Sequence, residues 1–139
     1  MRVSVKADYA VRAVFGLAGR YAPGAVRRVE ELAAEQGIPP SYLVQILLEL
    51  KAAHLVKSQR GKDGGYQLAR PPGEITFGDV LRAVQGELFS SPAVADPRCA
   101  AELRDQWASL QRALENAADA VTFQDLVERS RERDRMYYI

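Results

Sequence analysis

Apolar residues recur at helical spacing in three segments of the first half of the chain. Residues 5–21 carry a broad apolar face that ends at a Pro-Gly turn. A second, short helix precedes Gly37, which suits a left-handed turn, and Ile38 is expected to fill the core beneath it. Pro40 suits the first position of a third helix. Together these signals predict a helix-turn-helix over residues 29–53. Its third helix has one apolar stripe at i, i+3, i+4 and i+7, formed by Leu43, Ile46, Leu47 and Leu50.

A short hairpin is expected directly after this segment. Two strand-like runs, residues 55–58 and 66–68, flank a turn that is rich in glycine and cations. We expect its glycines to supply the positive φ angles that a tight hairpin needs. A helix-turn-helix followed by a basic hairpin is a winged helix, whose usual ligand is duplex DNA. The turn contains Arg60, Gly61, Lys62, Gly64 and Gly65.

Two later helices begin with the same capping signal. Thr76 with Asp79, and Thr122 with Asp125, are threonine-acid pairs three residues apart, a variant of the capping box. Gly86 is the expected end of the first of these helices. Both signals are structural and carry no information about function.

A long helix with a narrow apolar seam is expected between them. Residues 87–99 have no helical period and contain two prolines, so they read as a loop. Beyond them, apolar residues alternate in spacings of four and three, the a/d pattern of a coiled coil. A winged helix over residues 1–86 completes its own core, so a further narrow apolar helix needs a partner. The alternative is an amphipathic helix packed on its own domain. The seam consists of Leu103, Trp107, Leu110, Leu114, Ala117 and Val121.

Composition fits one globular domain with an oligomerisation element. The 139 residues are 47% hydrophobic and 27% charged. The expected fold is mostly α with a small β-hairpin wing. Its parts are a winged helix-turn-helix domain (1–86), a loop (87–99), a dimerisation helix with a following short helix (100–130) and a tail (131–139).

Charge and residue usage narrow the classes of function. Residues 1–71 hold 11 Lys and Arg against 6 Asp and Glu, whereas residues 72–139 hold 8 against 12, so a polyanion would meet the first half. No apolar run approaches a membrane span, and no signal peptide is visible, which makes the cytoplasm the expected compartment. With one histidine, one cysteine and no phosphate loop or paired catalytic carboxylates, the chain is not expected to be an enzyme.

Two sequence blocks resemble a known family. Residues 38–47 (Ile-Pro-Pro-Ser-Tyr-Leu-Val-Gln-Ile-Leu) and residues 58–68 (Ser-Gln-Arg-Gly…Gly-Gly-Tyr-Gln-Leu) resemble the Rrf-two type of winged-helix transcription regulators. The resemblance covers roughly residues 1–130. The family includes an iron–sulfur cluster regulator, a nitric-oxide-sensitive repressor and a cysteine-metabolism repressor. It implies a homodimer, most often a repressor, that reads an inverted repeat in double-stranded DNA. The third helix would enter the major groove and the wing the minor groove.

The resemblance carries DNA contact over to four residues. Gln45 can offer a donor and an acceptor to adenine, and Arg60 can reach a narrow minor groove. Ser41 and Tyr42 can donate to phosphates. The alternative for Ser41 and Gln45 is a solvated helix surface, and for Tyr42 it is packing on the wing. Val44 can meet a thymine methyl, and the expected set is completed by Arg28, Lys57, Gly61 and Lys62.

The chain departs from the family's cluster-sensing members. Those members carry three cysteines before the long helix, whereas this chain has only Cys99, so neither a cluster nor another metal or cofactor is expected. Asp8 resembles an oxygen ligand of some members, but an ion pair with Arg12 is the preferred interpretation. His54 stands where the family usually has glycine and is read as a helix C-cap.

Two further hypotheses stay open. Cys99 could act as a single-thiol redox switch favoured by the neighbouring Arg98, or it could be a partly buried apolar residue. The winged helix could also serve as a protein-interaction module without DNA contact. The cations of the wing favour DNA over that alternative.

Overall fold

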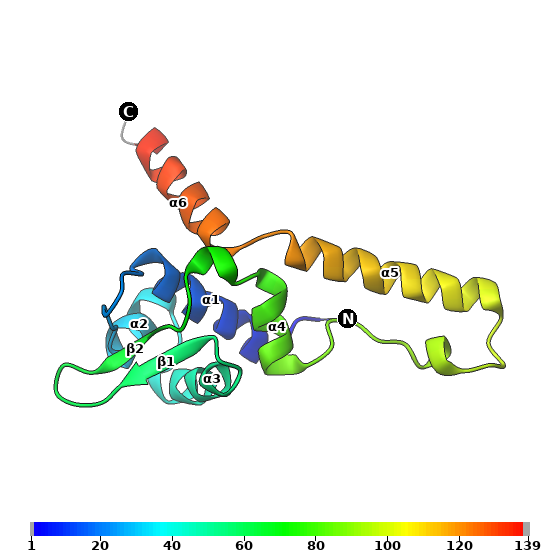
Figure 1. Cartoon of the computed structure of the whole chain (residues 1–139), viewed down its shortest axis with the longest axis horizontal. Coiled ribbons are helices and arrows are strands. Elements are labelled where there is room, and N and C mark those ends of the chain that lie inside the picture. The colour runs from blue at the N-terminus through cyan, green and yellow to red at the C-terminus, as the bar shows by residue number, and fades with distance from the viewer. Residues whose placement is uncertain (1, 138–139) are drawn as a thin grey trace.

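The computed structural model describes residues 2–137, which form a winged-helix domain with a projecting helical arm (Figure 1). The helices and strands, in chain order, are α1 (Val5–Gly19), α2 (Val29–Gln36), α3 (Pro40–Ala52), β1 (Val56–Gln59), β2 (Gly65–Leu68), α4 (Phe77–Gln85), α5 (Ala101–Asp119) and α6 (Phe123–Tyr137), with short 3-10 helices at Pro72–Glu74 and Pro92–Ala95. The mostly α fold with a hairpin wing is the one predicted. In the described part of the chain, no helix has the length and hydropathy needed to cross a membrane.

The core lies between α1 and the helix-turn-helix. Helix α1 packs against α2, α3, α4 and α6, which makes it the central element of the domain. Small residues on its buried face let these helices approach closely, and the predicted stripe of α3 is fully buried against it. Burial of this stripe turns the remaining face of α3 to solvent.

The turn between α2 and α3 confirms the sequence signals. Gly37 adopts the left-handed conformation with φ 68°, and Ile38 beneath it is buried. Pro40 occupies the first turn of α3, where its missing N–H costs no hydrogen bond. At the other end, Ala53 is the C-cap of α3, so the prediction of His54 as the cap was wrong by one residue; His54 follows with φ 63°. Among the described residues it is the only non-glycine with positive φ.

The wing is an antiparallel hairpin whose glycines serve two purposes. Residues 56–59 pair with 65–68 in register. Only Gly61, at φ 110°, supplies a positive φ, so the prediction was wrong for the other two glycines. A side chain at Gly64 would collide with the backbone of Gln59 and Arg60, and one at Gly65 would collide with the backbone of Arg27. Close backbone approach, rather than backbone conformation, requires glycine there.

A third backbone segment joins the hairpin at Arg27. The N–H and carbonyl of Arg27 exchange hydrogen bonds of 2.8 Å with those of Tyr66. The Arg27 side chain is buried, donates to the carbonyl of Gly16 at 3.3 Å and pairs with Glu35 at 2.8 Å. One residue thus fastens the wing to α1 and α2.

Both predicted capping boxes are present, and they face each other. The Thr76 hydroxyl accepts from the Asp79 N–H at 3.0 Å, and the Thr122 hydroxyl accepts from that of Asp125 at 3.1 Å. Backbone hydrogen bonds cross between the two helix starts, from Phe77 N–H to the Val121 carbonyl and from Phe123 N–H to the Ile75 carbonyl. Helices α4 and α6 therefore begin at one shared anchor.

Helix α6 is longer than predicted. It continues to Tyr137, so the short helix and the tail at 131–139 were wrong for residues 131–137; residues 138 and 139 lie outside the described part. The segment has no glycine or proline after its cap, and Gln124 and Glu128 form an i,i+4 hydrogen bond. The low apolar content of this segment gave no helical period, whereas the capping box and the i,i+4 side-chain hydrogen bond favour a helix.

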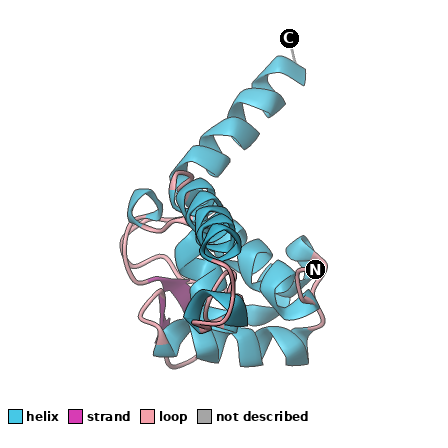
Figure 2. Ribbon diagram, turned by 90° about the vertical axis from the view of Figure 1, so that its right-hand side faces the viewer, coloured by secondary structure: helices cyan, strands magenta, loops and turns pink. Residues whose placement is uncertain are grey.

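Helix α5 projects from the domain as an arm. It lies to the right in Figure 1 and points toward the viewer in Figure 2. Its root is fixed by Asp119, whose carboxylate accepts two hydrogen bonds from Arg82 of α4, at 2.8 and 2.9 Å. Residues 87–99 run alongside, and Phe89 stacks on Trp107 at 5.9 Å between ring centroids. This loop contains one 3-10 turn, Pro92–Ala95, which the sequence pattern did not predict.

A pH-dependent contribution to stability is expected from the Arg27–Glu35 pair. The hydrogen bond from Arg27 holds the pKa of Glu35 below its usual range, although partial burial opposes the shift. A lowered folded-state pKa adds stability above the unfolded value of about 4.3, and that stability is lost as pH falls through the folded pKa. Urea unfolding of Arg27→Met and wild type should therefore differ most above pH 5 and converge in acid. Arg20→Met, which removes a weaker contact of 3.9 Å to Glu35, should show a smaller difference. A gap between wild type and Arg27→Met that does not change with pH would contradict this account.

Candidate nucleic-acid interface

The solvent face of α3 presents the residues predicted to read DNA. Ser41, Tyr42, Val44 and Gln45 are all exposed, on the side opposite the buried stripe. Leu48 is exposed on the same helix and was missed, because a leucine next to an apolar stripe reads as core. The face therefore combines amide and hydroxyl groups with apolar surface, which is what base edges and thymine methyls require.

Tyr42 packs on α1. Its ring makes an edge-to-face contact with Tyr9 at 5.6 Å between centroids, a contact that the sequence did not predict. The Arg12 guanidinium lies over the other ring of this pair, 5.6 Å from the centroid of Tyr9. These contacts hold the start of α3 against α1 and leave Tyr42 partly exposed.

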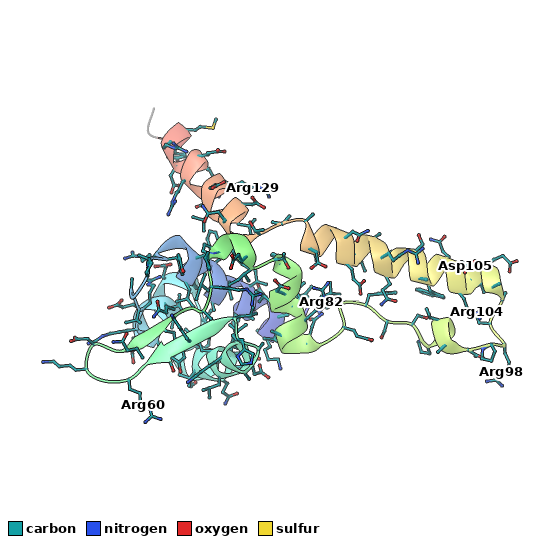
Figure 3. All side chains as sticks on the ribbon, viewed as in Figure 1. Arg60, Arg82, Arg98, Arg104, Asp105 and Arg129 are labelled. Carbon is teal, nitrogen blue, oxygen red and sulfur yellow. The ribbon has the colours of Figure 1, made fainter. Side chains whose placement is uncertain are left out.

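The wing carries its cations at the surface. Lys57, Arg60 and Lys62 are exposed, and Figure 3 shows Arg60 extending away from the body of the domain. Arg28 is exposed as well, but its guanidinium donates to the Lys62 carbonyl at 2.7 Å. Arg28 thus braces the wing turn against the start of α2, a structural task that the sequence did not indicate.

Helix α3 and the wing form one surface. The Lys51 ammonium at the end of α3 donates to the Ser58 hydroxyl of β1 at 2.7 Å, which ties the two elements together. Figure 1 shows the hairpin alongside α3 at one end of the molecule. Glu49 is paired with Lys6 at 3.1 Å, so its charge is compensated. The result is a surface with net positive charge and an exposed helix beside a basic hairpin.

The seam of α5 is open to solvent. No residue of α5, which is described throughout, is buried. Leu103 is 58% exposed, and Trp107, Leu110 and Leu114 are 39–42% exposed. Ala117 is also exposed, whereas Val121 lies beyond the end of α5 and its carbonyl accepts from Phe77. Val121 therefore belongs to the shared anchor of α4 and α6, and the predicted seam is shorter by one position.

A family model decides the class of this protein. It is described as an iron-dependent transcriptional regulator, Rrf2, and it matches residues 3–129. The chain belongs to the Rrf2 family. This is the Rrf-two type that the sequence blocks resemble, and its members are DNA-binding transcriptional regulators rather than enzymes.

Curated relatives and solved structures agree with the Rrf2 assignment. A protein of Mycobacterium tuberculosis named as a helix-turn-helix-type transcriptional regulator is 43% identical, over 91% of this chain and 81% of its own length. CymR of Bacillus subtilis is 31% identical over 91% of this chain and 89% of its own. The structure of CymR, titled the global cysteine regulator, superposes with a TM-score of 0.82 at 28% identity, over 92% of this chain and 97% of that one. The structure of T. potens IscR superposes with a TM-score of 0.79 at 33% identity, over 96% of this chain and 90% of that one.

The side chains of this Rrf2 protein do not fit an iron–sulfur cluster. Cys99 is its single cysteine, and its side chain is neither fully buried nor fully exposed. Asp8 pairs with Arg12 at 3.0 Å, as predicted, so its carboxylate is engaged. Between residues 2 and 137, no three His, Cys, Asp or Glu side chains come together as a metal site would require. Arg98 contacts Asp96 at 3.4 Å, and its proposed effect on Cys99 stays a hypothesis.

Proposed function

We propose that this Rrf2 protein is a homodimeric repressor that binds an inverted-repeat operator without an iron–sulfur cluster. The observation that carries the proposal is the joined surface of α3 and the wing. A helix of polar and apolar groups suits the major groove, and an arginine on a glycine hairpin suits the minor groove. The exposed cations around them, Lys57 and Lys62, would neutralise phosphates.

The proposed homodimer rests on α5. Four large apolar side chains lie exposed along one stripe of a helix that stands clear of its own domain. Soluble proteins rarely leave such a stripe uncovered, and a second copy of the same helix offers a matching one. A two-fold axis at α5 would present two winged helices to DNA, which is the symmetry of an inverted repeat. Repression then follows from occupying a promoter site.

Two substitutions on the proposed interface test this function. Gln45→Ala should reduce discrimination at one adenine position by about 1–3 kcal/mol, because the amide can pair bidentately with that base. Arg60→Ala should weaken binding and lower the salt dependence by about one phosphate contact, with loss of preference outside the major-groove positions. Gel shifts at several salt concentrations, with a duplex selected from a random pool, measure both effects.

Matched controls keep the test specific. Gln85→Ala and Arg98→Ala remove the same side chains from exposed positions on α4 and on the loop before α5, and they should bind as wild type. If Gln45→Ala and Arg60→Ala also bind as wild type, the proposed interface is wrong. Complete indifference of the wild type to duplex DNA at low salt would favour the protein-interaction module instead.

A further inference from the structure

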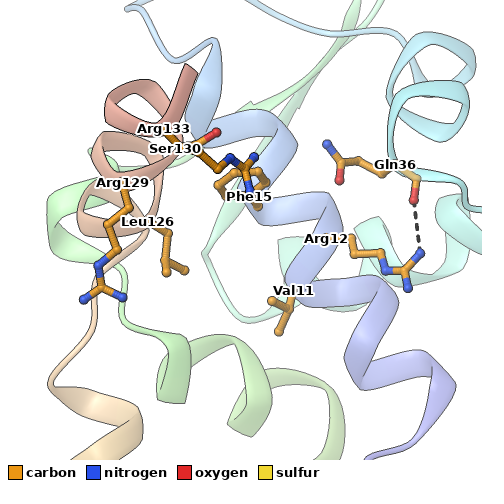
Figure 4. Close-up of a pocket in the computed structure, with 8 residues that line it drawn as sticks. All are labelled: Val11, Arg12, Phe15, Gln36, Leu126, Arg129, Ser130 and Arg133. Atoms are coloured by element: carbon orange, nitrogen blue, oxygen red, sulfur yellow. Dashed lines mark hydrogen bonds between the residues drawn. The ribbon is translucent and has the colours of Figure 1, made fainter. Parts of the chain in front are cut away.

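A hollow lined by arginines lies between α1 and α6, away from the proposed DNA-binding surface (Figure 4). Its volume is about 480 Å³, within the range of small-molecule sites. One wall is apolar and comes from Val11, Phe15 and Leu126, all partly buried against the core. The other lining residues carry hydrogen-bond donors: Arg12, Gln36, Arg129, Ser130 and Arg133.

Two of the arginines, Arg129 and Arg133, form no ion pair within the described part of the chain. No acidic residue of this part lines the hollow. Asp125, one turn before Arg129, attracts the Arg129 guanidinium, but its carboxylate is held mainly by the backbone N–H of Thr122 at 2.9 Å. A lining that combines three arginines with apolar side chains and contains no acidic residue favours a ligand with a negative head and an apolar body.

We propose that this hollow binds a small organic acid, with its carboxylate on Arg129 and Arg133 and its apolar body against Phe15, Val11 and Leu126. Guanidinium forks match the planar geometry of a carboxylate and can hold it by paired hydrogen bonds. An aromatic or branched aliphatic body would cover the exposed part of the apolar wall. The hydroxyl of Ser130 and the amide of Gln36 supply further polar contacts at the rim.

The hollow is connected to α3 through Arg12. This residue lines the hollow, donates to the Gln36 carbonyl at 3.4 Å just before the Gly37 turn, and lies over the ring of Tyr9. Tyr9 in turn contacts Tyr42 at the start of α3. A carboxylate in the hollow would compete with Asp8, which holds Arg12 at 3.0 Å, and by drawing Arg12 toward itself it would loosen the contacts that position α3. The bound acid would therefore lower DNA affinity, a step that rests on the proposed function.

The binding site can be tested without DNA. The probe is 2-naphthoate, followed by its fluorescence anisotropy with the full-length protein. The neutral amide of 2-naphthoate lacks the charge, and acetate lacks the apolar body. Each should bind at least about tenfold more weakly than 2-naphthoate. The double variant Arg129→Gln with Arg133→Gln should lower the affinity for 2-naphthoate by about tenfold or more.

The matched control is the pair Arg131→Gln with Arg135→Gln, which removes the same charge from the same helix outside this hollow. The control should bind 2-naphthoate as wild type does. The site is refuted if 2-naphthoate fails to bind below about 1 mM, binds no better than its amide, or binds equally to both double variants. The comparison between 2-naphthoate and its amide uses the wild-type protein alone. It therefore tests the requirement for a carboxylate even if a variant folds poorly.

A second arm separates regulation from binding. Saturating 2-naphthoate should lower affinity for the selected duplex by about fivefold or more. Binding of 2-naphthoate with unchanged DNA affinity would overturn the regulatory step. A protein that binds 2-naphthoate but never binds duplex DNA would instead overturn the proposed function and leave the site standing.

Discussion

Replacing Leu110 by glutamate is expected to convert the protein to a monomer and to reduce operator affinity by about a hundredfold or more. The side chain lies in the middle of the exposed stripe of α5. In a symmetric pair, two carboxylates would enter the same apolar contact, where neither could be solvated. Without the second subunit, each winged helix would bind its half-site alone and lose the gain from linkage. Sedimentation equilibrium and gel shifts on the same samples measure both effects.

Ser109→Glu is the control for this experiment. It introduces the same charge at the neighbouring, exposed position, which points away from the stripe. That variant should stay dimeric and bind as wild type does. A Leu110→Glu protein that remains a dimer with full affinity would show that α5 does not join the subunits.

Gly65→Ala is expected to destabilise the fold by about 3 kcal/mol. The new Cβ would collide with the backbone of Arg27, which no side-chain rotation can relieve. Relief would require breaking the paired hydrogen bonds between Arg27 and Tyr66, and these attach the wing to the helices. Urea unfolding followed by circular dichroism measures the loss.

A glycine-to-alanine substitution at an uncrowded position should not destabilise the fold. Gly19 lies in the last turn of α1, and a Cβ there would meet nothing within 4 Å. Gly19→Ala should leave stability unchanged or raise it by up to about 1 kcal/mol, because it reduces the entropy of the unfolded chain. Equal effects at both glycines would rule out backbone crowding as the reason for Gly65.

Local signals in the sequence predicted much of the fold. Gly37, Pro40 and the stripe of α3 act within one or two helical turns, so their consequences can be read from neighbouring positions. The same holds for the capping boxes at Thr76 and Thr122. The exposed face of α3 followed directly from the position of its buried face.

Features that depend on distant backbone could not be predicted. Arg27 reads as one more cation next to Arg28, yet the fold buries one and leaves the other exposed. The reason for Gly65 lies 38 positions earlier in the chain, at Arg27. The arginine hollow is likewise assembled from α1, the end of α2 and α6, which share no sequence pattern.

The paired starts of α4 and α6 have a geometric consequence for the proposed operator. Asp119 and the backbone hydrogen bonds between the two helix starts fix the root of α5 on the winged helix. Helix α5 and the winged helix would therefore move as one rigid body. One inserted base pair rotates a half-site by roughly 35° about the duplex axis, because B-DNA repeats about every 10 base pairs. A rigid connection cannot follow that rotation. The dimer would therefore discriminate the number of base pairs between the half-sites as strictly as it discriminates the bases themselves.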